Sequence, residues 1–195
     1  MGRVATVERK TSETDIRLTL DLDGTGVSEI STGIGFFDHM LTLFARHGLH
    51  DLSLTVAGDL HVDAHHTVED TGLALGEAIR RAVGDKRGLV RYGSLLLPME
   101  EALVACALDL GGRPGLGYQL AIPSDRLGGM EAELVEEFFK SICNAGLMNI
   151  HLVQMAGTNS HHIVEAAFKG FGRALDQATR IDPRSNAVPS TKGVL

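Results

Sequence analysis

His65-His66-Thr67-Val68-Glu69 returns 96 residues later as His161-His162-Ile163-Val164-Glu165, and this repetition shows how the chain is organised. Other short segments recur in the same order: Leu20-Asp21-Leu22 returns as Leu108-Asp109-Leu110 after 88 residues, and Gly48-Leu49 as Gly146-Leu147 after 98 residues. The spacings differ because the loops between the matched segments differ in length. Similarity in a fixed order over most of two halves indicates an internal duplication.

The spacing of apolar residues predicts strands and helices in the first half. Residues 16–22 alternate apolar and polar side chains, as a half-buried strand does. Residues 36–44 and 67–83 carry apolar side chains at helical spacing, and we expect Gly48 and Gly84 to end these two helices. The first half is therefore expected to combine strands and helices.

The duplication and this pattern of elements predict an α+β fold. We expect two similar halves, about 1–90 and 91–185, that form one unit with an irregular C-terminal tail at 186–195. Mixed β-sheets are expected on the outside, with the helices packed between them.

Composition narrows the class of protein. The chain of 195 residues is 44% hydrophobic and 22% charged, which is typical of a globular protein. Its net charge of −7 argues against binding to duplex nucleic acid or to an anionic membrane, and no apolar run approaches the ~20 residues of a membrane span. The charged residues 1–15 lack the apolar core of a signal peptide. Cys106 and Cys143 lie in apolar stretches and are expected to be buried free thiols, which favours the cytoplasm.

The HHxxE segments supply side chains that bind metal ions. In a helix, Glu69 lies three residues from His66 and four from His65, so its carboxylate reaches beside either ring. Adjacent helical residues point about 100° apart, so two neighbouring histidines cannot chelate one ion from the same face. Each segment therefore suits two metal ions, or a bridge from one subunit to another. Imidazole and carboxylate donors without a thiolate favour Mn, Fe or Zn.

The recurrence of this segment favours a metal site over its simpler explanation, surface histidines at a helix start with a capping glutamate. The duplication also adds one donor to each copy, because His39 matches Glu137 after 98 residues. The eight candidate ligands are His39, His65, His66, Glu69, Glu137, His161, His162 and Glu165. Eight nitrogen and oxygen donors for two ions leave positions open for water or substrate, as in a catalytic site.

Three further histidines are expected to be structural. His151 alternates with apolar neighbours on a predicted strand. His50 lies near a helix end, where a cation suits the helix dipole. His61 is expected to lie on the polar face of a strand.

Four cations stand out in this acidic chain: Arg91, Arg113, Lys169 and Lys192. With small hydroxyl groups they suit a phosphate monoester, through charge-assisted and bidentate contacts. Each is explained equally well as a solvated surface charge. The segment Ser190-Thr191-Lys192-Gly193 lacks the glycines that precede these residues in a P-loop, so nucleotide binding is not expected.

Five segments together resemble one known family over nearly the whole chain. They are GFFDHML (35–41), DAHHTVED (63–70), LDLGGRP (108–114), NSHHIVEAAFK (159–169) and PSTKGVL (189–195). The family is imidazoleglycerol-phosphate dehydratase of histidine biosynthesis. The resemblance implies a duplicated α+β fold with two Mn²⁺ ions per active site. It also implies active sites between subunits in a homo-oligomer of twenty-four chains.

The resemblance also implies roles for individual residues. Glu13 and Glu165 are expected to be catalytic, with Glu13 shuttling a proton. The residues expected to contact substrate are Glu13, His39, His47, His65, Glu69, Arg91, Arg113, His161, Lys169, Ser190, Thr191 and Lys192. One position departs from the family, whose members often have His where this chain has Glu137. Glutamate is a competent Mn²⁺ ligand, and the alternative for Glu137 is an acid on the helix surface.

The implied reaction removes water from D-erythro-1-(imidazol-4-yl)glycerol 3-phosphate to give 3-(imidazol-4-yl)-2-oxopropyl phosphate. The proton to be removed lies next to no carbonyl group, so enolate stabilisation is not available. A metal-bound imidazole loses its ring proton more readily. The imidazolate then expels the side-chain hydroxyl to give a diazafulvene-like intermediate, a base removes the C–H proton, and the enol becomes the ketone.

Two other classes of function use the same residues. A dinuclear metallohydrolase such as a phosphatase would release inorganic phosphate, which a dehydratase does not. A metal-storage or scaffold protein would keep the ligands and need no phosphate-binding residues. Ligand sets alone do not determine the class of reaction.

Overall fold

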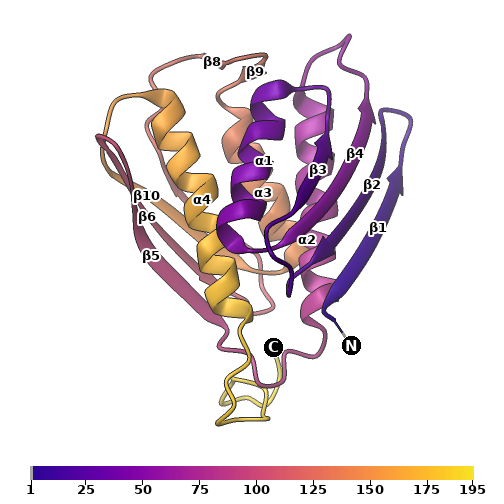
Figure 1. The fold of residues 1–195 in the computed structure, drawn as a ribbon, viewed down its shortest axis with the longest axis vertical. Coiled ribbons are helices and arrows are strands. Elements are labelled where there is room, and N and C mark those ends of the chain that lie inside the picture. The colour runs from indigo at the N-terminus through magenta and orange to yellow at the C-terminus, as the bar shows by residue number, and fades with distance from the viewer. Residues whose placement is uncertain (1) are drawn as a thin grey trace.

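The computed structural model describes residues 2–195, with four helices and two four-stranded mixed sheets in that part of the chain (Figure 1). The first half contains β1 (Val4–Lys10), β2 (Thr14–Asp21), β3 (Ser28–Ser31), α1 (Gly35–Gly48), β4 (Asp51–Gly58) and α2 (His65–Val83). The second half contains β5 (Tyr92–Met99), β6 (Ala102–Asp109), β7 (Gly115–Gln119), β8 (Arg126–Leu127), β9 (Met130–Glu131), α3 (Leu134–Gly146), β10 (Asn149–Ala156) and α4 (Ser160–Thr179). The α+β class expected from the sequence is confirmed.

The two sheets have the same topology, as a duplication requires. Their strand orders are β1-β2-β4-β3 and β5-β6-β10-β7. The last strand of each sheet is parallel to its neighbour, and the other pairs are antiparallel. The register agrees too, since Leu20 pairs with Leu52 in one sheet and the matched residues Leu108 and Ile150 pair in the other. The β8–β9 hairpin has no counterpart in the first half.

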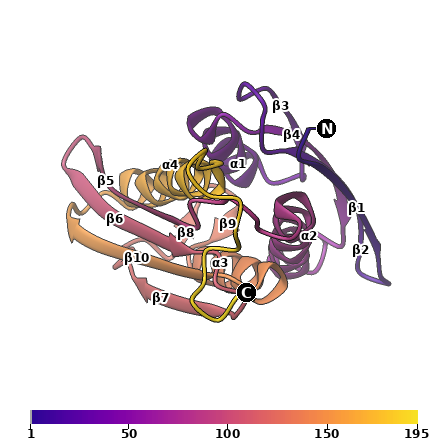
Figure 2. The same ribbon diagram turned by 90° about the horizontal axis from the view of Figure 1, so that it is seen from below.

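The helices lie between the two sheets, which form the outer layers (Figures 1 and 2). The most extensive helix contacts join α2 to α3 and α1 to α4, so each pair takes one helix from each half. Alternate residues of β2 and β6 point inward and are buried, which gives both sheets an apolar inner face. The halves therefore share one core.

Glycines allow the helix pairs to approach closely. A Cβ atom on Gly172 of α4 would lie 2.4 Å from the carbonyl oxygen of Phe44 in α1. The matched Gly76 of α2 would place a Cβ atom 2.6 Å from the carbonyl oxygen of Ile142 in α3. Both distances are shorter than real Cβ contacts, so each crossing depends on the missing side chain.

Several local expectations are confirmed, and three need correction. The strand at 16–22 and the helices at 36–44 and 67–83 are present, and both cysteines are free and buried. Gly48 is the last residue of α1, and the left-handed cap is Leu49, with φ 57°. His61 lies in a turn rather than on a strand.

His50 was expected to be a cation that suits the dipole near a helix end, but it is fully buried against the Phe44 ring. The short connection from α1 to β4 turns its side chain inward, and burial lowers its pKa, which disfavours a cation. None of the helices in residues 2–195 has the length and apolar character needed to cross a membrane.

Candidate metal centre

The two histidine pairs lie at the first residues of α2 and α4. Asn159 caps α4, since its side-chain oxygen accepts hydrogen bonds from the backbone N–H groups of His161 at 2.9 Å and His162 at 3.2 Å. Asp63 accepts from the backbone N–H of His65 at 2.8 Å. These contacts fix both helix starts, from which the four imidazole rings project.

The two rings of each pair point in different directions, as the helical spacing predicts. The His65 and His66 rings are inclined at 84° with centroids 6.0 Å apart, and the His161 and His162 rings at 84° with centroids 6.3 Å apart. The first histidine of each pair turns toward the neighbouring helix of the other half. The second turns toward carboxylates outside the helix pair.

His39, His161 and Glu165 form one group of donors, here called the His39 cluster. One ligand atom from each lies within 4.8 Å of the others. The Glu165 Oε2 atom lies 3.1 Å from His161 Nε2 and 3.7 Å from His39 Nε2. α1 supplies His39 and α4 supplies the other two, so the α1–α4 crossing builds this cluster. The edge of the Phe36 ring packs on His161, with centroids 5.4 Å apart.

Glu165 is the least exposed member of this cluster, and its side chain is 9% exposed. Burial favours its neutral form, but hydrogen bonds from Lys169 and His161 and the positive charge of Lys169 outweigh it, so its pKa is lowered. Its Oε1 atom accepts from Lys169 Nζ, and its Oε2 atom faces the two histidines. Glu165 is therefore an anion with one oxygen directed into the cluster.

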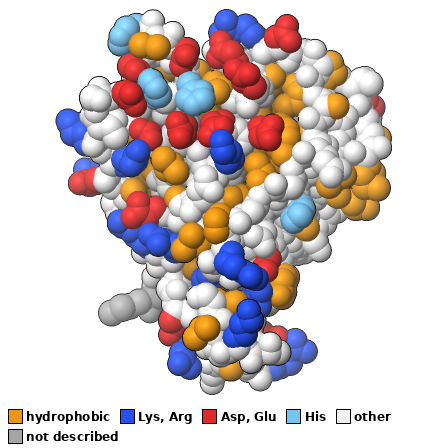
Figure 3. Space-filling model, turned by 180° about the vertical axis from the view of Figure 1, so that it is seen from behind, with side chains coloured by type: hydrophobic (Ala, Val, Ile, Leu, Met, Phe, Trp, Pro, Cys, Tyr) orange, Lys and Arg blue, Asp and Glu red, His pale blue; other side chains and the backbone are white. Residues whose placement is uncertain are grey.

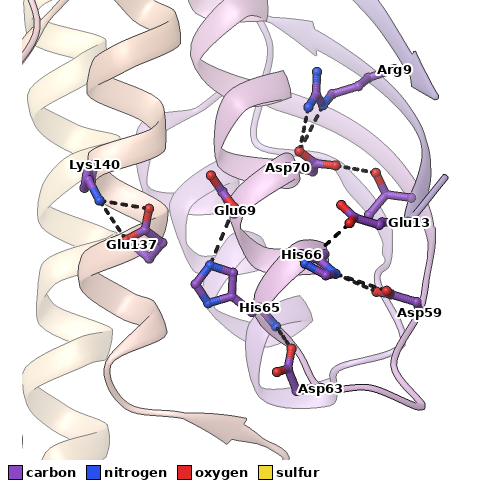
Figure 4. A network of polar contacts seen from close by, with 11 residues as sticks. Arg9, Glu13, Asp59, Asp63, His65, His66, Glu69, Asp70, Glu137 and Lys140 are labelled. Atoms are coloured by element: carbon purple, nitrogen blue, oxygen red, sulfur yellow. Dashed lines mark hydrogen bonds and ion pairs between the residues drawn. The ribbon is translucent and has the colours of Figure 1, made fainter. Parts of the chain in front are cut away.

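The second group occupies the positions that match the His39 cluster in the duplicated unit. It consists of Glu137, His65 and Glu69 and is here called the His65 cluster. The Nε2 atom of His65 lies 3.5 Å from Glu69 Oε2, and Glu137 lies across from them on α3 (Figure 4). The Glu137 carboxylate is directed to Lys140 of its own helix, at 3.1 Å. The two clusters occupy equivalent positions in the two halves. Of the two, only the His39 cluster has all three of its donor atoms within 4.8 Å of one another.

His66 and His162 lie outside these clusters and contact other carboxylates. The Nδ1 atom of His66 lies 3.0 Å from Asp59 Oδ2, and that of His162 lies 2.7 Å from Glu101 Oε2. These hydrogen bonds raise the pKa of both histidines, and the contacts to Glu101 hold the pKa of that carboxyl at about 2. Sequence reasoning missed Asp59 and Glu101 as site residues. The internal duplication could have pointed to Glu101, because Glu101 lies 88 residues after Glu13 and matches it.

Glu13 lies in the loop before β2, and its Oε1 atom is 3.8 Å from His66 Nε2 (Figure 4). His47 lies in the last turn of α1, where partial burial of its ring and the charges of Lys169 and Arg173 lower its pKa. Lys169 lies beside Glu165, with its Nζ atom also 3.5 Å from the Met99 sulfur. His47 and Lys169 are therefore near the His39 cluster.

Most of the expected phosphate-binding residues lie elsewhere, around one cavity of about 730 Å³. Arg91, Arg113, Ser190, Thr191 and Lys192 line it, together with neighbouring backbone. Arg91 donates to both carboxylate oxygens of Asp109, at 2.7 and 3.0 Å, and to the carbonyl oxygen of Pro189 at 2.8 Å. The hydrogen bond to Asp109 raises the pKa of Arg91.

This cavity and the donor clusters lie at opposite ends of the molecule. Arg91 immediately precedes β5, and Glu101, which contacts His162, follows its far end. At about 3.3 Å per residue, such a strand separates them by about 30 Å. Figure 3 shows histidine and acidic side chains gathered at the upper end and Lys and Arg side chains around the lower extension. A single chain does not bring these two groups together.

The donor set of the His39 cluster fits a divalent first-row ion. Imidazole nitrogen and carboxylate oxygen are the ligands that Mn²⁺, Fe²⁺ and Zn²⁺ accept. Three donors from one chain leave coordination positions open. Cys106 and Cys143 are buried in the core, where burial raises their thiol pKa values, so neither contributes a thiolate.

Comparison with known proteins places the chain in a family. The imidazoleglycerol-phosphate dehydratase (IGPD) family model matches residues 32–175. The chain is 58% identical to the imidazoleglycerol-phosphate dehydratase of Lachnoclostridium phytofermentans and 57% identical to that of Acetivibrio thermocellus, with both chains of each pair covered completely.

Solved structures agree with this assignment. The Staphylococcus aureus imidazoleglycerol-phosphate dehydratase superposes with a TM-score of 0.82 at 34% identity, over 92% of this chain and 98% of that one. The Pyrococcus furiosus IGPD superposes with a TM-score of 0.84 at 39% identity, over 97% of this chain and 100% of that one. The chain therefore belongs to the imidazoleglycerol-phosphate dehydratase family, hydro-lyases that act on imidazoleglycerol phosphate in histidine biosynthesis.

Proposed function

We propose that this chain dehydrates D-erythro-1-(imidazol-4-yl)glycerol 3-phosphate with two divalent ions, Mn²⁺ by preference, in each active site. The observation that carries the metal dependence is the His39 cluster, in which donors from two helices lie within 4.8 Å of one another. The ions would be held by His39, His65, His66, Glu69, Glu137, His161, His162 and Glu165. When bound, they supply Lewis acidity that lowers the pKa of the substrate imidazole.

The chain's own carboxylates would move the protons. Glu13 is half exposed, next to His66, and we assign it to proton transfer at the substrate side chain. Glu165 is held as an anion by Lys169 and would accept the second proton. Loss of the hydroxyl from the deprotonated substrate ring gives a diazafulvene-like species, which loses its C–H proton and becomes the ketone after enol formation.

The substrate phosphate would be held by Arg91, Arg113, Ser190, Thr191 and Lys192, with Lys169 approaching from the metal side. A separation of about 30 Å along β5 is far longer than a glycerol chain between an imidazole and a phosphate. We therefore propose that one copy supplies metal ligands and another supplies the phosphate cavity. Family resemblance implies the same self-association, into twenty-four chains.

We also propose that the protein works in the cytoplasm, since its two thiols are free and buried. The acidic net charge gives no reason to expect nucleic acid or membrane as a partner.

One experiment tests the function directly. Mn²⁺-loaded protein is incubated with imidazoleglycerol phosphate, and products are followed by mass spectrometry together with an assay for inorganic phosphate. The dehydratase yields a ketone lighter by one water and releases no phosphate. Phosphate release would instead identify a metallohydrolase. Metal-loaded protein that leaves the substrate intact would overturn the proposal.

A further inference from the structure

The second histidine of each pair, His66 or His162, has a carboxylate on its Nδ1 atom. Glu101 Oε2 lies 2.7 Å from His162 Nδ1, and Asp59 Oδ2 lies 3.0 Å from His66 Nδ1. An ionised carboxylate only accepts hydrogen bonds, so the ring nitrogen that faces it carries the hydrogen. When the ring is neutral, the Nε2 atom is then the one with the free lone pair.

Glu101 is itself fixed at both oxygens. Its Oε1 atom accepts from the backbone N–H of Asn159 at 3.0 Å, and its Oε2 atom accepts from His162. Asn159 is also the residue that caps α4. Glu101 thus connects the turn before β6 to the first turn of α4, and the direction of the His162 ring follows from that connection.

The two carboxylates come from different positions of the duplicated unit. Glu101 immediately precedes β6, where the first half has Glu13 immediately before β2. Asp59 immediately follows β4, where the second half has Gly157 immediately after β10. The two halves therefore orient matched histidines with unmatched acids.

The second half cannot place an acid at the Asp59 position. Gly157 has φ +107°, a conformation that side chains rarely adopt, and a Cβ atom there would lie 2.6 Å from the Cα atom of Ala102. Glu101 is then the acid available to His162. In the first half, Asp59 accepts a hydrogen bond from His66 Nδ1. Glu13 Oε1 lies 3.8 Å from His66 Nε2, beyond hydrogen-bond distance.

We propose that Glu101 and Asp59 are positioning residues that hold His162 and His66 with the proton on Nδ1 and with Nε2 as the metal donor. Because Asp59 orients His66, the Glu13 carboxylate is free to act on substrate. The matched residue of the second half, Glu101, instead orients His162. The inference rests on the proposed metal-dependent function and adds residues to it. Carboxylates that orient ligand histidines typically contribute 10–100-fold to metal affinity.

The test measures Mn²⁺ affinity by titration calorimetry and the Mn²⁺ spectrum by electron paramagnetic resonance, in the assembled protein. Glu101→Ala and Asp59→Ala are each expected to weaken Mn²⁺ binding about 10–100-fold and to alter the spectrum. Glu101→Gln retains a hydrogen-bond acceptor and is expected to recover part of the affinity. Glu13→Gln is expected to bind Mn²⁺ as tightly as the parent.

Glu100→Ala is the matched control, since Glu100 is adjacent, exposed and within reach of the same histidine. Unchanged Mn²⁺ affinity in this variant is expected. An equal loss in Glu100→Ala and Glu101→Ala would identify a separate cation site and overturn the positioning role. Circular dichroism checks the folding of each variant. If Glu101→Ala does not fold, the positioning role is tested by comparing the Mn²⁺ affinity of Glu101→Gln with that of the parent.

Failure of this inference differs from failure of the proposed function. If the parent binds Mn²⁺ and dehydrates the substrate while Glu101→Ala and Asp59→Ala bind Mn²⁺ as tightly, the function stands and the positioning role is wrong. If Glu13→Gln weakens Mn²⁺ binding as much as Asp59→Ala, then the proposal that Asp59 orients His66 while Glu13 stays free for substrate is wrong. If the parent protein binds no Mn²⁺, both proposals are overturned.

Discussion

His39 and Glu165 belong to different halves of the chain, yet His39 Nε2 lies 3.7 Å from Glu165 Oε2. The contact exists because α1 packs on α4 across the centre of the molecule. Neither HHxxE segment forms a donor cluster alone, since each needs a residue from a helix of the other half. A metal ion bound at these candidate donors would therefore couple to the packing of the two halves.

His39→Ala is expected to reduce Mn²⁺ content, because it removes one of three donors in the His39 cluster. We expect at least about tenfold weaker binding at that site, measured by metal analysis after dialysis against a chelator. His151→Ala is the control, since His151 lies exposed on β10, outside both clusters. Equal metal content in the two variants would remove His39 from the ligand set.

Glu13→Gln is expected to retain metal content and size but to lose about 10²- to 10⁴-fold in turnover, since an amide cannot transfer the proton. Steady-state kinetics and light scattering check these outcomes. Turnover equal to that of the parent would show that another group moves the proton.

Arg113→Ala is expected to raise KM for the phosphorylated substrate about tenfold or more, because it removes a cation from the cavity around the C-terminal tail. Arg17→Ala serves as control, since Arg17 is 75% exposed on β2 and far from that cavity in sequence. A KM that is the same in both variants would place the phosphate elsewhere.

Gly172→Ala is expected to lower the free energy of unfolding by about 1–3 kcal/mol, since the new methyl group overlaps the Phe44 carbonyl oxygen. Gly35→Ala is the matched control: it lies in α1, its added Cβ meets nothing within 4 Å, and alanine favours a helix. Urea unfolding at a fixed protein concentration compares the two. Equal stability would show that the α1–α4 crossing relaxes without cost.

Acid is expected to destabilise the fold through His50. Burial lowers its pKa below the ordinary value of 6.5, opposed by Asp176 and reinforced by Arg3. Below pH 6.5 the unfolded chain therefore binds more protons than the folded one, and stability falls as pH drops toward the folded-state pKa. For this one group, the free energy of unfolding changes by at most about 1.4 kcal/mol per pH unit.

His50→Leu is expected to flatten this pH dependence, whatever its effect on stability at pH 8. Urea unfolding at pH 8, 7, 6 and 5.5 measures the difference in slope between the parent and the variant. Parallel slopes would show that His50 is not protonated on unfolding in this range.

The sequence was informative wherever a pattern is local or repeated. Alternation over residues 16–22 predicts β2, and the spacing of Phe37, Met40, Leu41 and Phe44 predicts α1, because each burial pattern follows from the geometry of its own element. Matched HHxxE segments pointed to the candidate donors, since the duplication places both copies at equivalent helix starts.

Local rules failed where a neighbouring element decides the environment. His50 follows a helix end, but the packing of α4 and Phe44 around it makes it a buried ring. Asp59 and Glu101 carry no motif, and their role depends on loops that bring each to a histidine distant in sequence.

Repeated segments in the sequence indicate two equivalent halves, point to the candidate metal donors and carry the resemblance to the family. Which candidate donors meet depends on helix packing, because the crossings of α1 with α4 and α2 with α3 join residues that no spacing relates. The fold also separates the cavity around the C-terminal tail from the candidate metal donors by the length of β5. Rigid strands fix that distance, and a sequence pattern holds no information about it.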